Sequence, residues 1–245
     1  MINNNFYSKC KNYNRIYNDN QPFPHLVFDD FLDQTLIEQA AIEAKKYTTN
    51  YLKLGSIGAD EHADQQKKHL VDDILSLPPI LQLICRYING ESFIRFLRGI
   101  TNLDSIVGDS HLIGGGLHFT ERGGYLGIHH DFNFMEGEEK AGVDIPLCYR
   151  KCNLILFLND HWEDGWGGEL ELWNKSLTAR THSIMPKLNR AVLFNIENAP
   201  HGHPHPLNCP NYECRRTLAF YFYDQIPVNN KLYERAHWKY GQELL

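Results

Sequence analysis

Apolar residues recur at helical spacing in the first half of the chain. Between residues 33 and 100, three segments place an apolar side chain every three or four positions, which predicts three amphipathic helices with one buried face each. Asp33 is placed to cap the first helix, which we expect to begin near Gln34. Pro79 favours the start of the second helix, and Gly99 is expected to end the third.

Three other segments of this half lack helical spacing. Residues 1–20 are rich in Asn, Tyr and Lys, and they predict a poorly ordered N-terminal arm. Residues 25–28 are mostly apolar and follow Pro24, which favours a short extended strand. The polar stretch from residue 55 to residue 69 predicts a loop.

The pattern changes after about residue 105, where short apolar runs alternate with turns rich in Gly, Asn, Asp and Pro. The predicted strands are 112–113, 116–119, 125–130, 153–158, 169–173, 191–194 and 217–223. Short strands at this spacing favour a β-sandwich or jelly roll over alternating βα units. We therefore predict an α+β, mainly β fold in a single domain, 21–245. Its N-terminal helices (about 33–100) pack on a jelly-roll core (about 105–225).

Composition narrows the classes of partner. The 245 residues carry 24 Lys and Arg against 30 Asp and Glu, whereas nucleic-acid-binding proteins usually carry a basic surplus. No apolar run approaches the roughly 20 residues that span a bilayer, and the first residues lack the apolar segment of a secretory signal. We therefore expect no nucleic-acid partner, no membrane partner and a cytoplasmic location. The six cysteines are expected to be reduced.

A histidine and a carboxylate stand in a pattern typical of metal binding. His129 and Asp131 are two positions apart in a predicted strand, so their side chains share one face, together with that of Tyr125. With a second imidazole from a distant strand they form the two-histidine-one-carboxylate set that non-haem Fe(II) oxygenases use. The candidates for this second imidazole lie within the segment 200–206 and are His201, His203 and His205.

Arg215 and Thr217 share a face of the last predicted strand. A guanidinium beside a hydroxyl is suited to bind a carboxylate, because its planar fork donates paired, charged hydrogen bonds. The pair Arg215-Arg216 precedes an apolar and aromatic run that we expect to be packed. A charge on the inner face of that strand would need a partner.

The order of these motifs resembles that of the 2-oxoglutarate- and Fe(II)-dependent dioxygenases, and more narrowly of their prolyl-hydroxylase-like branch. The motifs are His-x-Asp at 129–131, His-Gly-x-Pro at 201–204 and Arg-x-Thr before an aromatic strand. Over roughly residues 21–225, further segments are similar to that branch, namely 22–33, 114–118, 123–126, 131–133, 153–159 and 167–173.

The resemblance implies a double-stranded β-helix with Fe(II) held by His129, Asp131 and His201. It implies that Arg215 binds the far carboxylate of 2-oxoglutarate, with Thr217 and Tyr125 close to this co-substrate. The implied reaction consumes dioxygen, releases succinate and carbon dioxide, and hydroxylates a C–H bond; ascorbate is expected as a stimulant. Asp131 favours hydroxylation over halogenation, because related halogenases have a small residue at this position.

Several alternatives stay open at this point. His205 has the shorter spacing to Arg215 that other branches use, although His-Gly-x-Pro favours His201. The substrate is a prolyl residue, an amino acid or another small metabolite, and Trp162 and Trp166 either contact it or anchor a loop. Two other functions compete: a non-catalytic β-barrel binding module, and a zinc hydrolase with the same ligands.

Overall fold

The computed structural model describes residues 1–2, 5–54, 63–131 and 148–224, together with the short strands at 134–135, 139–140 and 143–144. Half of the segment 134–149, whose sequence predicts loops flanking the first candidate ligands, therefore lies outside the described residues, as does the chain after residue 224. Among the described helices, none is long and apolar enough to cross a membrane. The division into one domain stays a prediction.

The helices precede most of the strands along the chain. They are α1 (Asn5–Ser8), α2 (Cys10–Asp19), α3 (Gln34–Lys53), the 3₁₀ turn η1 (Ile74–Ser76), α4 (Pro79–Ile88) and α5 (Glu91–Thr101). The main strands are β1 (His25–Phe28), β2 (Gln65–Val71), β3 (Ile106–Gly108), β4 (Gly116–His129), β8 (Cys148–Phe157), β9 (Leu170–Trp173), β10 (Arg180–Ile184), β11 (Ala191–Asn195), β12 (His201–His203) and β13 (Cys214–Asp224). The short strands are β5 (Phe134–Met135), β6 (Glu139–Lys140) and β7 (Val143–Asp144).

The predicted helix starts and the first strand are confirmed. The Asp33 carboxylate accepts a hydrogen bond from the backbone N–H of Leu36 at 3.1 Å, which caps α3. α4 begins at Pro79, and β1 covers residues 25–28. The third helix, however, does not end at Gly99. It continues to Thr101, because Asn102 adopts the left-handed conformation that ends a helix.

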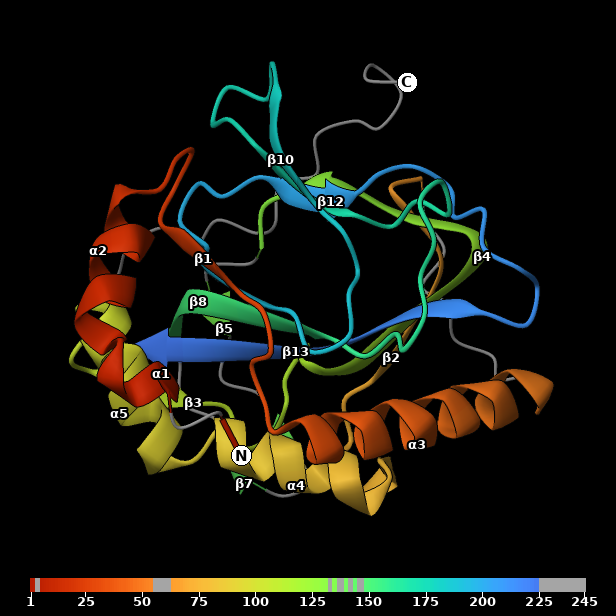
Figure 1. Ribbon diagram of the computed structural model, residues 1–245, viewed down its shortest axis with the longest axis horizontal. Helices are drawn as coiled ribbons and strands as arrows, with labels where there is room; N and C mark the ends of the chain where they lie inside the picture. Colours follow the sequence, from red (N-terminus) through yellow and green to blue (C-terminus); the bar gives the residue numbers. More distant parts are fainter. Residues whose placement is uncertain are drawn as a thin grey trace.

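The prediction of a poorly ordered arm at residues 1–20 is wrong for its described part. α2 packs on α5 and β1 at one end of the molecule (Figure 1). The side chain of Tyr17 is buried, and its hydroxyl forms a hydrogen bond with the Cys152 thiol of β8 at 3.7 Å. The buried Tyr17 holds this helix, and Asn14 adds a hydrogen bond from its side-chain amide to the Ile100 carbonyl of α5 at 2.8 Å.

Two strand predictions also need correction. Residues 65–69, predicted as a loop, belong to β2, which pairs with β4; the buried ring of His69 stacks on Phe119 at 4.7 Å between centroids. Residues 112–113, predicted as a strand, form a turn, because the Asp109 carboxylate accepts hydrogen bonds from the backbone N–H groups of His111 and Ile113.

The main strands and β5 form one curled antiparallel sheet, whose path is β1-β11-β8-β13-β4-β12-β9-β10, as a double-stranded β-helix requires, and β6 and β7 pair separately. β4 is shared between the two sides of the curled sheet. Its residues 116–121 pair with β13, whereas its residues 126 and 129 pair with β12. The sheet thus has an outer face and an enclosed inner face, which confirms the predicted mainly β jelly-roll fold.

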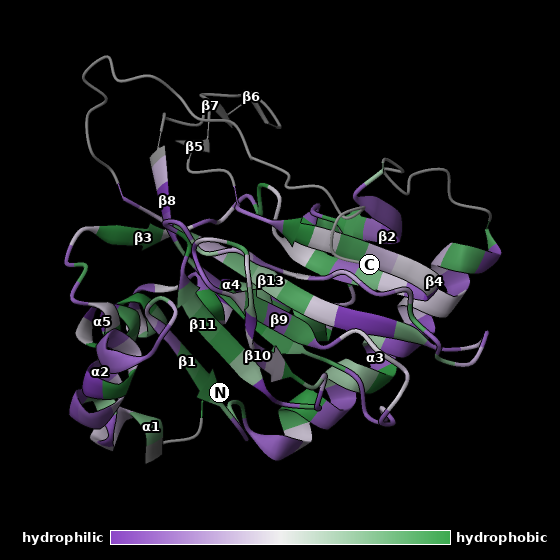
Figure 2. Cartoon of the chain, turned by 90° about the horizontal axis from the view of Figure 1, so that it is seen from above, coloured by the Kyte–Doolittle hydropathy of each residue, from purple (hydrophilic) through white to green (hydrophobic). Residues whose placement is uncertain are grey.

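Alternate residues of β8 divide between two cores on the two faces of the sheet. Leu154 and Leu156 join the larger core between the sheet and the helices. Ile155 and Phe157 face the enclosed side and pack with Leu172 of β9 and its neighbours. α3 and α4 lie side by side against the outer face (Figure 1), and β1 and β11 are mainly hydrophobic (Figure 2). The polar groups described below lie on the enclosed side.

Candidate active site

Three of the predicted site residues come together where β4 meets β12. His129 is the last residue of β4, Asp131 follows two positions later, and His201 is the first residue of β12. The antiparallel register places His201 directly opposite His129. This close pairing requires glycine at position 202, because a Cβ there would lie 2.5 Å from the carbonyl oxygen of Gly127.

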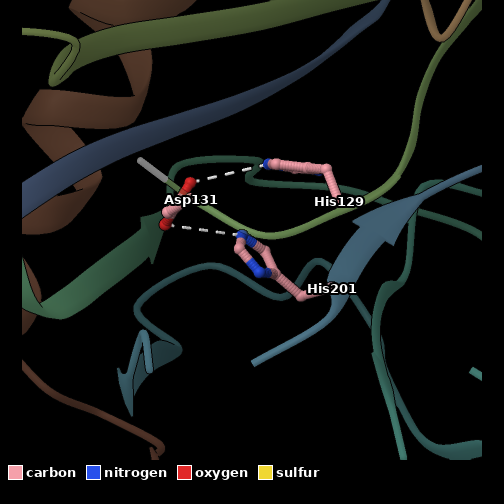
Figure 3. A group of neighbouring side chains, drawn as sticks. All are labelled: His129, Asp131 and His201. Atoms are coloured by element: carbon pink, nitrogen blue, oxygen red, sulfur yellow. Dashed lines mark ion pairs between the residues drawn. The ribbon is translucent and has the colours of Figure 1, made fainter. Parts of the chain in front are cut away.

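The three side chains point toward one another (Figure 3). The Nε2 atom of His129 lies 3.5 Å from Asp131 Oδ1, and the Nε2 atom of His201 lies 3.7 Å from Asp131 Oδ2. One potential ligand atom from each residue lies within 4.8 Å of the other two, and all three residues are buried. Two imidazoles and one carboxylate on one side of a small space leave the opposite side open to further ligands.

The backbone holds both imidazoles in the orientation that a metal needs. The Nδ1 atom of His129 lies 2.9 Å from the Gly127 carbonyl, and that of His201 lies 2.9 Å from the Ala199 carbonyl. Because a carbonyl oxygen can only accept, each Nδ1 carries the proton. The lone pairs of both Nε2 atoms are therefore directed at the space beside Asp131, as in the outer hydrogen bonding of metal-bound histidines.

The protonation of His201 and Asp131 also suits a cation. Burial lowers the pKa of His201 to about 4, so its imidazole is neutral at neutral pH. Burial alone would raise the pKa of Asp131. The electrostatic interactions with His201, His129 and Arg150 outweigh it, however, so that this pKa lies well below its usual range. A neutral imidazole at His201 and an ionised carboxylate fit a divalent metal ion.

Two further residues orient the carboxylate. The amide Nδ2 of Asn153 donates to Asp131 Oδ2 at 3.0 Å, and the hydroxyl of Tyr221 donates to Oδ1 at 3.4 Å. Our sequence analysis missed both. The signals were an asparagine in the apolar run of β8, and the position of Tyr221, which shares a strand face with Arg215 at a separation of six residues.

Arg215 lies on the enclosed side of β13 with little to neutralise its charge. The residue is 5% exposed, and its Nε donates to the carbonyl of Gly168 at 2.7 Å. Among the described residues it forms no ion pair, although the charge of Glu169 acts on it. Burial lowers the pKa of this guanidinium to about 9. A buried cation without a carboxylate partner is the environment expected of an anion-binding arginine.

The surroundings of Arg215 orient it. Its guanidinium carbon lies 5.0 Å from the ring centroid of Phe157, and the Gly168 loop approaches from the other direction. A Cβ at position 168 would lie 3.0 Å from Arg215 Cδ, and its φ of +78° also favours glycine. Thr217 is buried two positions farther along the same strand face, opposite His118 of β4.

The remaining candidates lie elsewhere. His205 is exposed and forms an ion pair with Glu171 at 3.7 Å, so it does not join the group around Asp131. The hydroxyl of Tyr125 donates to the Ala63 carbonyl at 2.9 Å, so its predicted proximity to the co-substrate stays a prediction. The indole N–H of Trp162 donates to the Gly167 carbonyl, and this hydrogen bond stabilises the loop that contacts Arg215.

Sequence analysis also missed a second buried arginine. The guanidinium carbon of Arg150 lies 3.7 Å above the ring centroid of Tyr221, and its Nη2 donates to the hydroxyl of Tyr223 at 3.3 Å and to the Ile113 carbonyl. The positive charge of Arg150 is one of those that keep Asp131 ionised.

With this geometry established, a family match becomes informative. Residues 115–223, which contain all the residues of the proposed site, match the sequence model of the 2OG-Fe(II) oxygenase superfamily. The match supports the predicted membership of the 2OG-Fe(II) oxygenase superfamily for this part of the chain. The predicted enzyme class is thereby confirmed as an Fe(II)- and 2-oxoglutarate-dependent oxygenase, and the non-catalytic binding module is set aside. The sequence matches none of the curated proteins with which it was compared.

Two solved structures have a fold similar to that of this chain. A prolyl-4-hydroxylase from Pseudomonas putida superposes with a TM-score of 0.54 at 17% identity, covering 87% of this chain and 99% of that one. A prolyl hydroxylase from Trichoplax adhaerens, in complex with a peptide of the hypoxia-inducible factor, superposes with a TM-score of 0.58 at 17% identity, covering 91% and 94%. At this identity the likeness concerns the fold, and it confirms the double-stranded β-helix.

Proposed function

We propose that His129, Asp131 and His201 hold Fe(II) in this oxygenase. The convergence of two Nε2 atoms and one carboxylate supports this assignment, together with the backbone hydrogen bonds that fix both imidazoles. Bound there, the iron together with 2-oxoglutarate and dioxygen supplies the oxidising chemistry that hydroxylates a C–H bond and releases succinate and carbon dioxide. A zinc hydrolase has no need of a buried, unneutralised Arg215, which is why the oxygenase is the better interpretation.

We propose that Arg215 binds the far carboxylate of 2-oxoglutarate, with Thr217 beside it. The carboxylate would neutralise a buried cation, and the planar guanidinium would orient it. The hydrogen bonds from Asn153 and Tyr221 would keep the two oxygens of Asp131 in place while ligands exchange on the open side. The protein thus contributes positioning and the exclusion of water.

The substrate that we propose is a prolyl residue in a peptide, an amino acid or another small metabolite, with hydroxylation as the reaction. The fold shared with prolyl hydroxylases supports the first choice, since one of these is described with a bound peptide. An ionised Asp131 supports hydroxylation, because the anionic ligand leaves no vacancy for a halide. Ascorbate is proposed to stimulate turnover.

The test is dioxygen-dependent formation of succinate from 2-oxoglutarate with Fe(II) present, compared among wild type, His201→Ala and His205→Ala. We expect wild type and His205→Ala to be active. His201→Ala should be inactive and should not bind iron tightly. The two histidines are four residues apart, so this pair of variants is closely matched. Full iron affinity in His201→Ala, or loss of it in His205→Ala, would contradict the ligand assignment.

A further inference from the structure

His203 is a buried histidine whose ring nitrogens form no hydrogen bond with the described part of the protein. The residue is 3% exposed, and neither Nδ1 nor Nε2 has a hydrogen-bond partner among the described residues. Buried polar groups are nearly always paired, and the buried His25 and His201 both donate through Nδ1 to a backbone carbonyl. His203 therefore presents a donor that the described part of the protein leaves unsatisfied.

The strand register brings His203 close to Arg215. On β4, the residue opposite His203 is Leu126 and the residue opposite Arg215 is Thr120. On its other side, β4 pairs with β2, where Gln65 is opposite Leu126 and Lys68 is opposite Thr120. Gln65 and Lys68 are only three positions apart, because the register between the two strands is irregular at this point. Three residues of a strand span about 10 Å, a separation that side chains from both ends can bridge.

Electrostatic influences agree with this placement. After burial, the largest effects that lower the pKa of His203 are the positive charges of Arg215, Lys68 and His129. Of these, Arg215 marks the co-substrate end of the proposed site and His129 the metal end. Lys68 stands in the same row as Arg215, because both residues are opposite Thr120 on the two sides of β4. His203 is therefore close enough to Arg215 and to His129 for the charge of each to act on it.

We propose that His203 donates a hydrogen bond to the far carboxylate of 2-oxoglutarate, beside Arg215, and so contributes to the selection of a dicarboxylate. This inference rests on the proposed function. Arg215 supplies the charge and the orientation, and the imidazole adds a directed N–H group that is otherwise unpaired among the described residues. The positive charge of Lys68 favours the same anion from β2.

Equilibrium binding to the Mn(II)-loaded protein without dioxygen tests this inference apart from turnover. The probes are 2-oxoglutarate and pyruvate, which has the same 2-oxo acid group but lacks the far carboxylate. Since a hydrogen bond to a charged group contributes about 1.5–3 kcal/mol, His203→Leu should raise the Kd of 2-oxoglutarate roughly 10- to 150-fold. The Kd values of pyruvate and of Mn(II) should stay unchanged.

His203→Asn keeps a side-chain N–H, so it should recover part of the affinity for 2-oxoglutarate, and it serves as the informative variant if the leucine variant does not fold. His205→Leu is the matched control and should bind both acids like wild type. An unchanged Kd for 2-oxoglutarate in His203→Leu, or an equal loss for both acids, would overturn the role of His203. If the wild type bound Mn(II) but no 2-oxoglutarate, the proposed function itself would fall.

Discussion

Two adjacent arginines of β13 occupy opposite faces of the sheet and have opposite electrostatic surroundings. Arg216 points to the outer face, where it forms an ion pair with Glu213 and its Nε donates to the hydroxyl of Thr48 at 2.8 Å. Arg215 points to the enclosed face, where the Gly168 carbonyl accepts from its Nε. Both residues are buried, with 1% and 5% exposure. Within the described part of the chain, Arg216 has a carboxylate partner and Arg215 forms no ion pair.

The difference separates a structural cation from a functional one. Glu213 is held by Arg216 and also by Lys45 at 2.8 Å, so the charges of the outer network are balanced within the fold. A buried cation that is left unbalanced costs stability, and such a cost is explained when a ligand supplies the missing anion. The comparison predicts that removing each arginine damages a different property of the protein.

The largest expected effect follows from Arg215→Met, a substitution that removes the charge and keeps most of the volume. Losing the charged partner of a desolvated carboxylate costs about 2–5 kcal/mol, so the Kd of 2-oxoglutarate should rise roughly 30- to several-thousand-fold. Metal affinity and the free energy of unfolding should not fall. Arg215→Lys should restore part of the affinity, because it offers a point charge without the fork. Calorimetry with the Mn(II)-loaded protein measures these affinities, and an unchanged Kd would refute the assignment.

The matched variant on the other face, Arg216→Met, should affect stability instead. Breaking a buried ion pair costs about 3–5 kcal/mol, because it leaves one charge uncompensated. We expect a loss near 3 kcal/mol, since Lys45 still contacts Glu213. Urea unfolding measures this loss, and the double variant Glu213→Gln/Arg216→Met should recover part of it. A rise in the Kd of 2-oxoglutarate comparable to that of Arg215→Met would remove the distinction between the two faces.

The outer network also predicts a dependence of stability on pH. Burial alone would raise the pKa of Glu213, but the hydrogen bond from Lys45 and the charge of Arg216 outweigh it and lower this pKa below its usual value of 4.5. The network therefore stabilises the fold fully above about pH 4.5, and this contribution is lost as the pH falls through the folded-state pKa. One proton corresponds to a slope of at most about 1.4 kcal/mol per pH unit.

The matched protein for this measurement is the double variant Glu213→Gln/Arg216→Met, which keeps the buried histidines. Their protonation destabilises both proteins alike, so it cancels in the difference of unfolding free energies. That difference should be constant above pH 4.5 and should shrink below it. A difference that is independent of pH down to the acid transition would show that Glu213 is not held by its neighbours as an ionised carboxylate.

Sequence patterns predicted the elements that local physics determines. The Asp33 cap and the helical spacing after it are local features, and the apolar run of β13 is long enough to be recognised as a strand. β2 and β12 were missed because their residues are mainly polar and owe their strand conformation to pairing with β4. The irregularity of β4 that brings these partners together is likewise a property of the assembled sheet.

The candidate site likewise has features that the sequence predicted and features that it did not. The order of His129, Asp131, His201 and Arg215 could be recognised from the chain, and the structure brings the first three together. The sequence alone could not show which of the two arginines lies on the side of Glu213, where Lys45 and Thr48 of the distant α3 also belong to the network. Asn153 and Tyr221 were missed for a related reason, since only the folded strands direct them at Asp131.

The smallest expected effect concerns Thr217, which lies two residues beyond Arg215 on the same buried strand face. Thr217→Val keeps the shape and removes only the hydroxyl. One hydrogen bond of this kind contributes about 0.5–1.5 kcal/mol, so the Kd of 2-oxoglutarate should rise by roughly 2- to 12-fold. The control is Thr48→Val on the outer face, whose hydroxyl accepts from Arg216. It should lower the free energy of unfolding and leave the Kd unchanged. If Thr217→Val bound the co-substrate like wild type but unfolded more easily, its hydroxyl would belong with the structural groups, and Arg215 would select the dicarboxylate without it.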